Sequence, residues 1–195
     1  MPESERDAWN RRFAEGSHSS LEADPLLVSA YEAYIQPLLG DASRKRALDV
    51  AGGAGRHALY MAERGWQTTL IDVSEVGAEK ARQNAAERGL RLDVRNQDLR
   101  FAELGSEACE LVMVFFYLQR ELFPALGRAL APGGILVYKT YTSEHPQLSG
   151  GKGPSHPMHL LQSNELLHAF PGLQVLYYRE TVKDKGVAEL IARKQ

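Results

Sequence analysis

The stretch that decides the fold is Ala47-Leu48-Asp49-Val50-Ala51-Gly52-Gly53-Ala54-Gly55-Arg56-His57-Ala58-Leu59. A short apolar strand is followed by a glycine-rich turn and then by the start of a helix. Glycines allow the backbone to turn sharply and allow a ligand to approach it closely, and the free N–H groups at the start of a helix favour a polar or anionic ligand. Open parallel α/β sheets bind nucleotides at such a turn after the first strand. The stretch therefore predicts a nucleotide-binding α/β domain.

Composition and charge narrow the class of protein. The chain has 195 residues, of which 44% are hydrophobic and 25% charged, as is ordinary for one globular domain. The formal net charge of -2 gives no general attraction to nucleic acid, so we expect no nucleic-acid partner. The lone cysteine, Cys109, is expected to be a packed thiol rather than a nucleophile. The first residues do not resemble a signal peptide, and the longest apolar run, 111–118, is too short to span a bilayer. We therefore expect a cytoplasmic protein without membrane contact.

Residues 1–42 are predicted to form a helical cap that precedes the sheet. Trp9 and Phe13 fall at helical spacing in a first short segment. Asp24-Pro25 is typical of an N-cap followed by proline at the first helical position, and Pro37 with Gly40 is expected to close this second helix.

From residue 46 the pattern alternates between strand and helix. Strands are predicted to end at 49–50 and to cover 67–72, 91–95, 111–117 and 135–141, with helices over 56–64, 75–88 and 120–130. Repeated βα units imply right-handed crossovers and a doubly wound parallel sheet. Two further runs, 173–182 and 187–193, predict an antiparallel hairpin. The expected fold is α/β, with a doubly wound, mostly parallel seven-stranded sheet, an N-terminal helical cap and a C-terminal antiparallel hairpin.

We expect a single domain, 1–195, that acts as a monomer or a homodimer. Its cofactor-binding core would be 46–142, and a C-terminal helix and hairpin would occupy 161–195. The intervening stretch, 143–160, is rich in proline, glycine and histidine. Long irregular loops in compact domains are more often functional lids than filler, so this loop is expected to lie on the substrate side.

The glycine turn is compatible with two alternative kinds of ligand. Gly53-Ala54-Gly55-Arg56-His57-Ala58 matches the dinucleotide pattern G-x-G-x-x-A, and Asp72 follows at a distance suited to a ribose carboxylate, which would indicate NAD and an oxidoreductase. Asp49, however, would bring a negative charge to a pyrophosphate. It suits a ligand with a cation there, such as an amine or a sulfonium. Asp98, after the third strand, can accept a hydrogen bond from an adenine amine.

The ordered set of motifs resembles the class I S-adenosylmethionine-dependent methyltransferases. The family's acid and spaced glycines look like 49–55, and the turn Leu130-Ala131-Pro132-Gly133-Gly134 is similar to the family's L-x-P-G-G. The resemblance implies a Rossmann-like methyltransferase fold over about 46–142, with S-adenosylmethionine as cofactor and S-adenosylhomocysteine as product. It also implies that Asp49 holds the methionine amine, Asp72 the ribose, and Asp98 with the backbone of Leu99 the adenine.

One residue departs from the family pattern. Ala51 stands where the family usually has its first glycine, and we expect it to keep a negative φ and to leave cofactor binding intact. The stretches 9–13 and 116–120 look like the tellurite-resistance and small-molecule methyltransferase subgroup. This subgroup implies a small acceptor.

The predicted cofactor-binding residues come from the motifs, the strand ends and the N-terminal segment. They are Asp49, Ala51, Gly52, Gly53, Gly55, Asp72, Val73, Asp98, Leu99, Phe115, Trp9 and Phe13. Each aspartate taken alone is also typical of a turn cap. Three of them at successive strand ends favour a shared ligand. Trp9 and Phe13 are equally consistent with docking of a helix on the core.

Candidates for contact with the acceptor are Arg120, Tyr117, His156 and His159. These two histidines and His145 in the same loop have no cysteine or carboxylate at ligand spacing, so we expect no metal. A solvated loop histidine is the ordinary interpretation, and a proton acceptor near the substrate is the alternative.

The predicted function is therefore methyl transfer from S-adenosylmethionine to a small acceptor, such as a thiol or a metalloid oxyanion like tellurite. Two alternatives stay open at this point. One is an NAD-dependent oxidoreductase that uses the same loop. The other is a non-catalytic module that binds S-adenosylmethionine.

Overall fold

A computed structural model describes residues 3–17, 20–42, 45–150 and 153–195. Parts of the predicted cap (1–2 and 18–19) and of the predicted loop (151–152) therefore lie outside the described residues. The chain divides into two compact units, 1–103 and 104–195.

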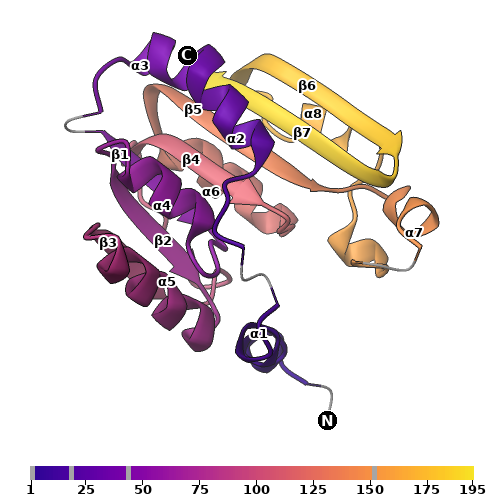
Figure 1. The fold of residues 1–195 in the computed structure, drawn as a ribbon. Coiled ribbons are helices and arrows are strands. Elements are labelled where there is room, and N and C mark those ends of the chain that lie inside the picture. Colours follow the sequence, from indigo (N-terminus) through magenta and orange to yellow (C-terminus); the bar gives the residue numbers. More distant parts are fainter. Residues whose placement is uncertain (1–2, 18–19, 43–44, 151–152) are drawn as a thin grey trace. The chain divides into compact units, whose positions relative to one another are not determined.

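The first unit has three parallel strands, each of the first two followed by a helix (Figure 1). Its elements are β1 (Arg46–Val50), α4 (Arg56–Ala62), β2 (Gln67–Asp72), α5 (Glu75–Glu87) and β3 (Leu92–Asn96). In the register, Asp49 pairs with Leu70 and Asp72 with Asn96. The carboxyl ends of the three strands therefore meet at one edge, as parallel pairing requires.

Helices precede this sheet, as predicted for the cap. They are α1 (Glu5–Ala14), α2 (Pro25–Ala30), the π-helical turn η1 (Tyr31–Ile35) and α3 (Gln36–Leu39). Pro37 and Gly40 close this helical segment, as predicted. Pro37 lies in its last turn, α3, and the helix ends at Leu39 because Gly40 adopts a φ of 71°.

The second unit has a parallel strand pair extended by an antiparallel hairpin, drawn in yellow in Figure 1. Its elements are β4 (Cys109–Phe115), η2 (Arg120–Leu122), α6 (Phe123–Ala129), β5 (Leu130–Tyr141), α7 (His145–Leu148), η3 (Pro157–His159), α8 (Glu165–His168), β6 (Leu173–Lys183) and β7 (Lys185–Lys194). The hydrogen-bonded strand order is β3-β2-β1-β4-β5-β7-β6. This order confirms the predicted seven-stranded, mostly parallel sheet with an antiparallel C-terminal hairpin.

Three details of the second unit differ from the prediction. β4 ends at Phe115 rather than at 117, because Phe116 adopts a left-handed φ of 58°. β5 begins at Leu130 rather than at 135, since the Pro-Gly-Gly turn is taken up by a register shift against β4. His145 is buried at 3% exposure, whereas a solvated loop histidine was expected. Its ring packs on Tyr141 at a centroid distance of 4.1 Å. Cys109 is buried, as predicted.

Among the described residues, no helix is both long enough and apolar enough to cross a membrane.

Candidate functional site

The glycine turn leaves β1 and enters α4 with very little free space around it. A Cβ at Gly52 would lie 2.7 Å from the Leu70 side chain and 2.8 Å from Oδ2 of Asp49. Gly55 has a φ of 89° and immediately precedes α4. The turn is closed by the Gly55 N–H, which donates to the Gly52 carbonyl at 3.0 Å. These positions therefore need glycine for close approach and for a left-handed backbone.

Ala51 contradicts the expectation of a negative φ. Its φ is 57°, in the left-handed region where a Cβ is strained by roughly 1–2 kcal/mol. The chain thus places an alanine at a position whose conformation favours glycine, within the predicted cofactor loop. Strain of this kind is retained where the surrounding structure fixes the backbone.

Replacing Ala51 by glycine should relieve this strain. We expect the free energy of unfolding to rise by about 0.5–1 kcal/mol, since a left-handed alanine costs more than the added freedom of glycine in the unfolded chain. Ala54 lies in the same turn and is not among the residues with positive φ. Ala54→Gly is therefore the matched control and should lower stability. The midpoints of urea unfolding check both changes, and a loss of stability in Ala51→Gly would contradict the strain.

Asp49 is the most unusual group of the site. It is 1% exposed, and its Oδ2 accepts from the Ala58 N–H of α4 at 3.0 Å. No described residue donates to its Oδ1. Burial raises the pKa of Asp49 to about 7, and the charge of Asp72 adds to this rise, while the Ala58 N–H and the Arg56 charge oppose it. A buried carboxylate oxygen that lacks a donor is costly unless a cation or a donor reaches it.

Asp72, at the end of β2, holds the glycine turn. Its Oδ2 accepts from the Gly53 N–H and its Oδ1 from the Ser74 N–H, both at 2.8 Å. Burial raises its pKa, and these two backbone bonds oppose the rise. Each carboxylate oxygen has a second lone pair. Asp72 can therefore accept from a diol while it fixes the turn.

Asp98 follows β3 near the same edge. The segment that leads to it is held by the Gln97 N–H, which donates to the Asp72 carbonyl at 2.9 Å. Its carboxylate pairs with Arg100 at 2.6 Å, and this contact lowers its pKa. The adjacent Leu99 is buried. Binding of adenine by Asp98 remains a prediction, in which the amine would share the carboxylate with Arg100.

Phe13 of α1 covers the glycine turn. It is 4% exposed, and a Cβ built on Gly53 or on Gly77 would lie 2.7 or 2.8 Å from its ring. Trp9 is half-buried, with its ring centroid 5.8 Å from that of Phe13, and the Arg12 guanidinium lies over its ring at 4.8 Å. Phe13 therefore docks α1 on the core, and its ring packs directly on the predicted cofactor loop.

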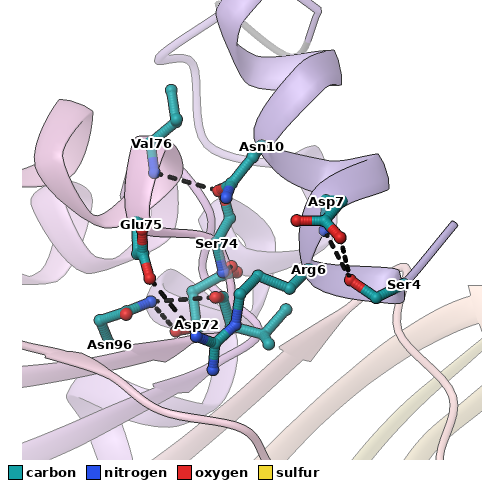
Figure 2. Close-up of polar contacts among 10 residues, drawn as sticks. Ser4, Arg6, Asp7, Asn10, Asp72, Ser74, Glu75, Val76 and Asn96 are labelled. Carbon is teal, nitrogen blue, oxygen red and sulfur yellow. Dashed lines mark hydrogen bonds and ion pairs between the residues drawn. The ribbon is translucent and has the colours of Figure 1, made fainter.

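Sequence reasoning missed two residues that connect α1 to this site (Figure 2). Asn10 Oδ1 accepts from the Ser74 hydroxyl at 2.7 Å and from the Val76 N–H at 3.3 Å. Ser74 is fully buried, and its N–H binds Asp72. The available signal was the serine directly before a predicted helix. Nothing local in the sequence pairs it with Asn10.

The remaining candidates lie in the second unit. Phe115 ends β4 and is buried. The Tyr117 hydroxyl donates to Gln119 Oε1 at 2.7 Å. Arg120 forms a bidentate pair with Glu165, at 2.5 and 2.9 Å, and donates to the Leu160 carbonyl at 2.9 Å. Arg120 therefore fastens the segment around η3 to its own unit, and its contact with an acceptor remains a prediction.

His156 and His159 are exposed, and the centroids of their rings are 6.1 Å apart. His156 Nδ1 accepts from the Met158 N–H at 3.2 Å, which caps η3. In the described ranges, no group of three or more histidine, cysteine or acidic side chains is arranged to hold a metal ion.

Comparisons with known proteins place this chain among proteins with methyltransferase names and folds. Residues 47–134 match a family model described as a methyltransferase domain. The ubiquinone biosynthesis O-methyltransferase of Idiomarina loihiensis is 28% identical over 123 residues, which are 60% of this chain and 49% of that protein. The tRNA 5-carboxymethoxyuridine methyltransferase of Escherichia coli K12 is 29% identical over 106 residues, or 50% and 41% of the two chains. The chain thus matches at most about half of the length of these relatives.

Solved structures share the fold. TehB from Haemophilus influenzae superposes with a TM-score of 0.72 at 18% identity, over 95% of this chain and 67% of that one. An S-adenosylmethionine-dependent methyltransferase from Mesorhizobium loti superposes with a TM-score of 0.67 at 17% identity, over 87% and 100% of the two chains.

Proposed function

We propose that this chain, whose residues 47–134 match a methyltransferase domain, transfers a methyl group from S-adenosylmethionine to a small-molecule acceptor. S-adenosylhomocysteine would be the second product. The proposal gives each acidic residue at the strand ends a role.

The observation that carries the proposal is the buried Asp49 oxygen that has no donor among the described residues. The cofactor carries an ammonium group on its methionine part, and such a cation satisfies a buried carboxylate. A pyrophosphate at this place would meet a negative charge instead. The residues present therefore fit S-adenosylmethionine better than NAD.

Three further groups complete the proposed binding. Asp72 accepts from the ribose hydroxyls with its second lone pairs, and Asp98 accepts from the adenine amine. Phe13 excludes water from the glycine turn, on which its ring packs. When bound, the cofactor supplies a methyl group on a positively charged sulfur, which is already activated for displacement. The protein then contributes mainly positioning and desolvation.

For the acceptor we propose a thiol or a metalloid oxyanion. Support comes from the similarity of 9–13 and 116–120 to the tellurite-resistance and small-molecule subgroup. The two relatives are named for ubiquinone biosynthesis and for tRNA modification. Acceptors of these two classes should therefore be tested beside thiols and metalloid oxyanions.

Calorimetry with the purified chain tests the choice of cofactor. We expect S-adenosylmethionine and S-adenosylhomocysteine to bind at one site and to compete with each other, while NAD gives no heat. Saturable binding of NAD without any heat from S-adenosylhomocysteine would contradict the proposal.

An acceptor panel tests the reaction itself. Radioactive methyl transfer is measured to thiols, tellurite, selenite, catechols and bulk tRNA. We expect turnover with a thiol or a metalloid oxyanion. Turnover confined to tRNA would show that the acceptor is RNA and not a small molecule. Binding of the cofactor without transfer to any acceptor would favour the alternative of a non-catalytic module that binds S-adenosylmethionine.

A further inference from the structure

Hydrogen bonds through Ser74 and Asp72 connect α1 to the glycine turn, and Figure 2 draws Asn10, Ser74 and Asp72 of this route. Asn10 Oδ1 accepts from the Ser74 hydroxyl at 2.7 Å. The Ser74 N–H donates to Asp72 Oδ1, and Asp72 Oδ2 accepts from the Gly53 N–H, both at 2.8 Å. Only Ser74 and Asp72 separate Asn10 from the turn. Asn10 is therefore linked to the Asp72 carboxylate at the end of β2 through a single residue, Ser74.

Asn10 also completes the first turn of α5. The first N–H groups of a helix have no partner within the helix. Ser74, the N-cap residue, accepts from the Gly77 N–H at 3.0 Å, and Asn10 accepts from the Val76 N–H at 3.3 Å. Asn10 thus acts as a second cap, supplied from α1. Loss of a capping side chain destabilises the start of a helix.

Apolar packing holds α1 in the same position. Phe13, three residues after Asn10 and so on the same face of the helix, lies against both Gly53 and Gly77. The Lys80 ammonium of α5 donates to the Phe13 carbonyl. The helix is therefore fixed at the glycine turn and at α5 together, with Asn10 between these contacts.

We propose that Asn10 is a positioning residue for the cofactor, which orients Asp72 through Ser74. Docking of α1 and binding of the cofactor then strengthen each other, since coupling between two sites is reciprocal. This inference rests on the proposed role of Asp72 as the ribose acceptor.

Calorimetric dissociation constants for S-adenosylhomocysteine test the inference. Asn10→Ala should weaken binding about three- to tenfold through loss of the acceptor. Asn10→Asp keeps an acceptor oxygen for both donors and should bind within about twofold of wild type. The control is Arg6→Ala, which removes an exposed contact between α1 and α5, the 3.3 Å pair with Glu75. It should also bind within about twofold of wild type.

A double-mutant cycle identifies the route. If Asn10 acts through Ser74, Asn10→Ala should weaken binding no further once Ser74→Ala is present. If the losses of affinity in the two single variants multiply in the double variant, the route through Ser74 is wrong. If Asn10→Ala binds like wild type while Asp72→Ala binds more weakly, the inference fails and the proposed function stands. Unchanged affinity in a folded Asp72→Ala would remove the ribose role and the inference with it. No binding by the wild type would overturn the proposed function itself.

Discussion

Replacing Asp49 by asparagine is expected to abolish measurable binding of S-adenosylhomocysteine and, at the same time, to stabilise the cofactor-free protein. Asparagine keeps an oxygen for the Ala58 N–H but brings no charge to meet the ammonium group. A lost contact between a buried carboxylate and a cation lowers affinity by about 3 kcal/mol or more, which is at least about a hundredfold. The stability gain arises because the folded protein buries the carboxylate and raises its pKa from the ordinary 3.8 to about 7.

The sign of the pH dependence follows from linkage. A carboxyl whose pKa is raised by folding favours the folded state when protonated, and this advantage is lost as the pH rises from about 3.8 to about 7. Asp49→Asn does not titrate, so its advantage over wild type should grow across this range and stay constant above it. We expect a gain of about 2 kcal/mol at pH 8.

Urea unfolding of both proteins at pH 5 and pH 8 measures this difference. Asp93→Asn is the control, because Asp93 is an exposed carboxylate paired with Arg95. It should show little change at either pH. A gain in Asp49→Asn that is no larger at pH 8 than at pH 5 would contradict a raised pKa.

Asp72→Ala is expected to have the second largest effect. The variant loses the acceptor proposed for the ribose, which weakens cofactor binding by about 1.5–3 kcal/mol. It also leaves the N–H groups of Gly53 and Ser74 without their 2.8 Å partner. Thermal unfolding should therefore show lower stability as well.

Asp98→Ala separates the two effects of this change. Asp98 is paired with Arg100, two residues further along the chain, and binds no glycine of the turn, so its loss should weaken binding less and leave stability nearly unchanged. A folded Asp72→Ala with wild-type affinity would remove Asp72 from the cofactor site.

The sequence was most informative where function depends on local pattern. The alternation of strands and helices predicted the sheet. The positions of Asp49 and Asp72 at the ends of two predicted strands predicted that both lie close to the glycine turn. Parallel pairing brings such strand ends together whatever the details of the loops. The observed register, with Asp72 beside Asn96, agrees with that reasoning.

Backbone conformation and contacts between distant residues were not predictable in the same way. Ala51 and Phe116 adopt φ values of 57° and 58°, which nothing in either side chain signals. The partnership of Asn10 with Ser74 joins residues 64 positions apart, and it depends on how α1 docks. Such features come from tertiary packing, which overrides local preference.

Proton release on binding tests most directly the claim that Asp49 receives the cofactor's ammonium group. S-adenosylhomocysteine is titrated by calorimetry at pH 6.5 in phosphate and in imidazole, whose ionisation enthalpies differ. With a pKa of about 7, about three quarters of Asp49 is protonated at this pH. Binding should therefore release more than about half a proton from the wild-type protein. Tight binding with the same heat in both buffers would contradict the account.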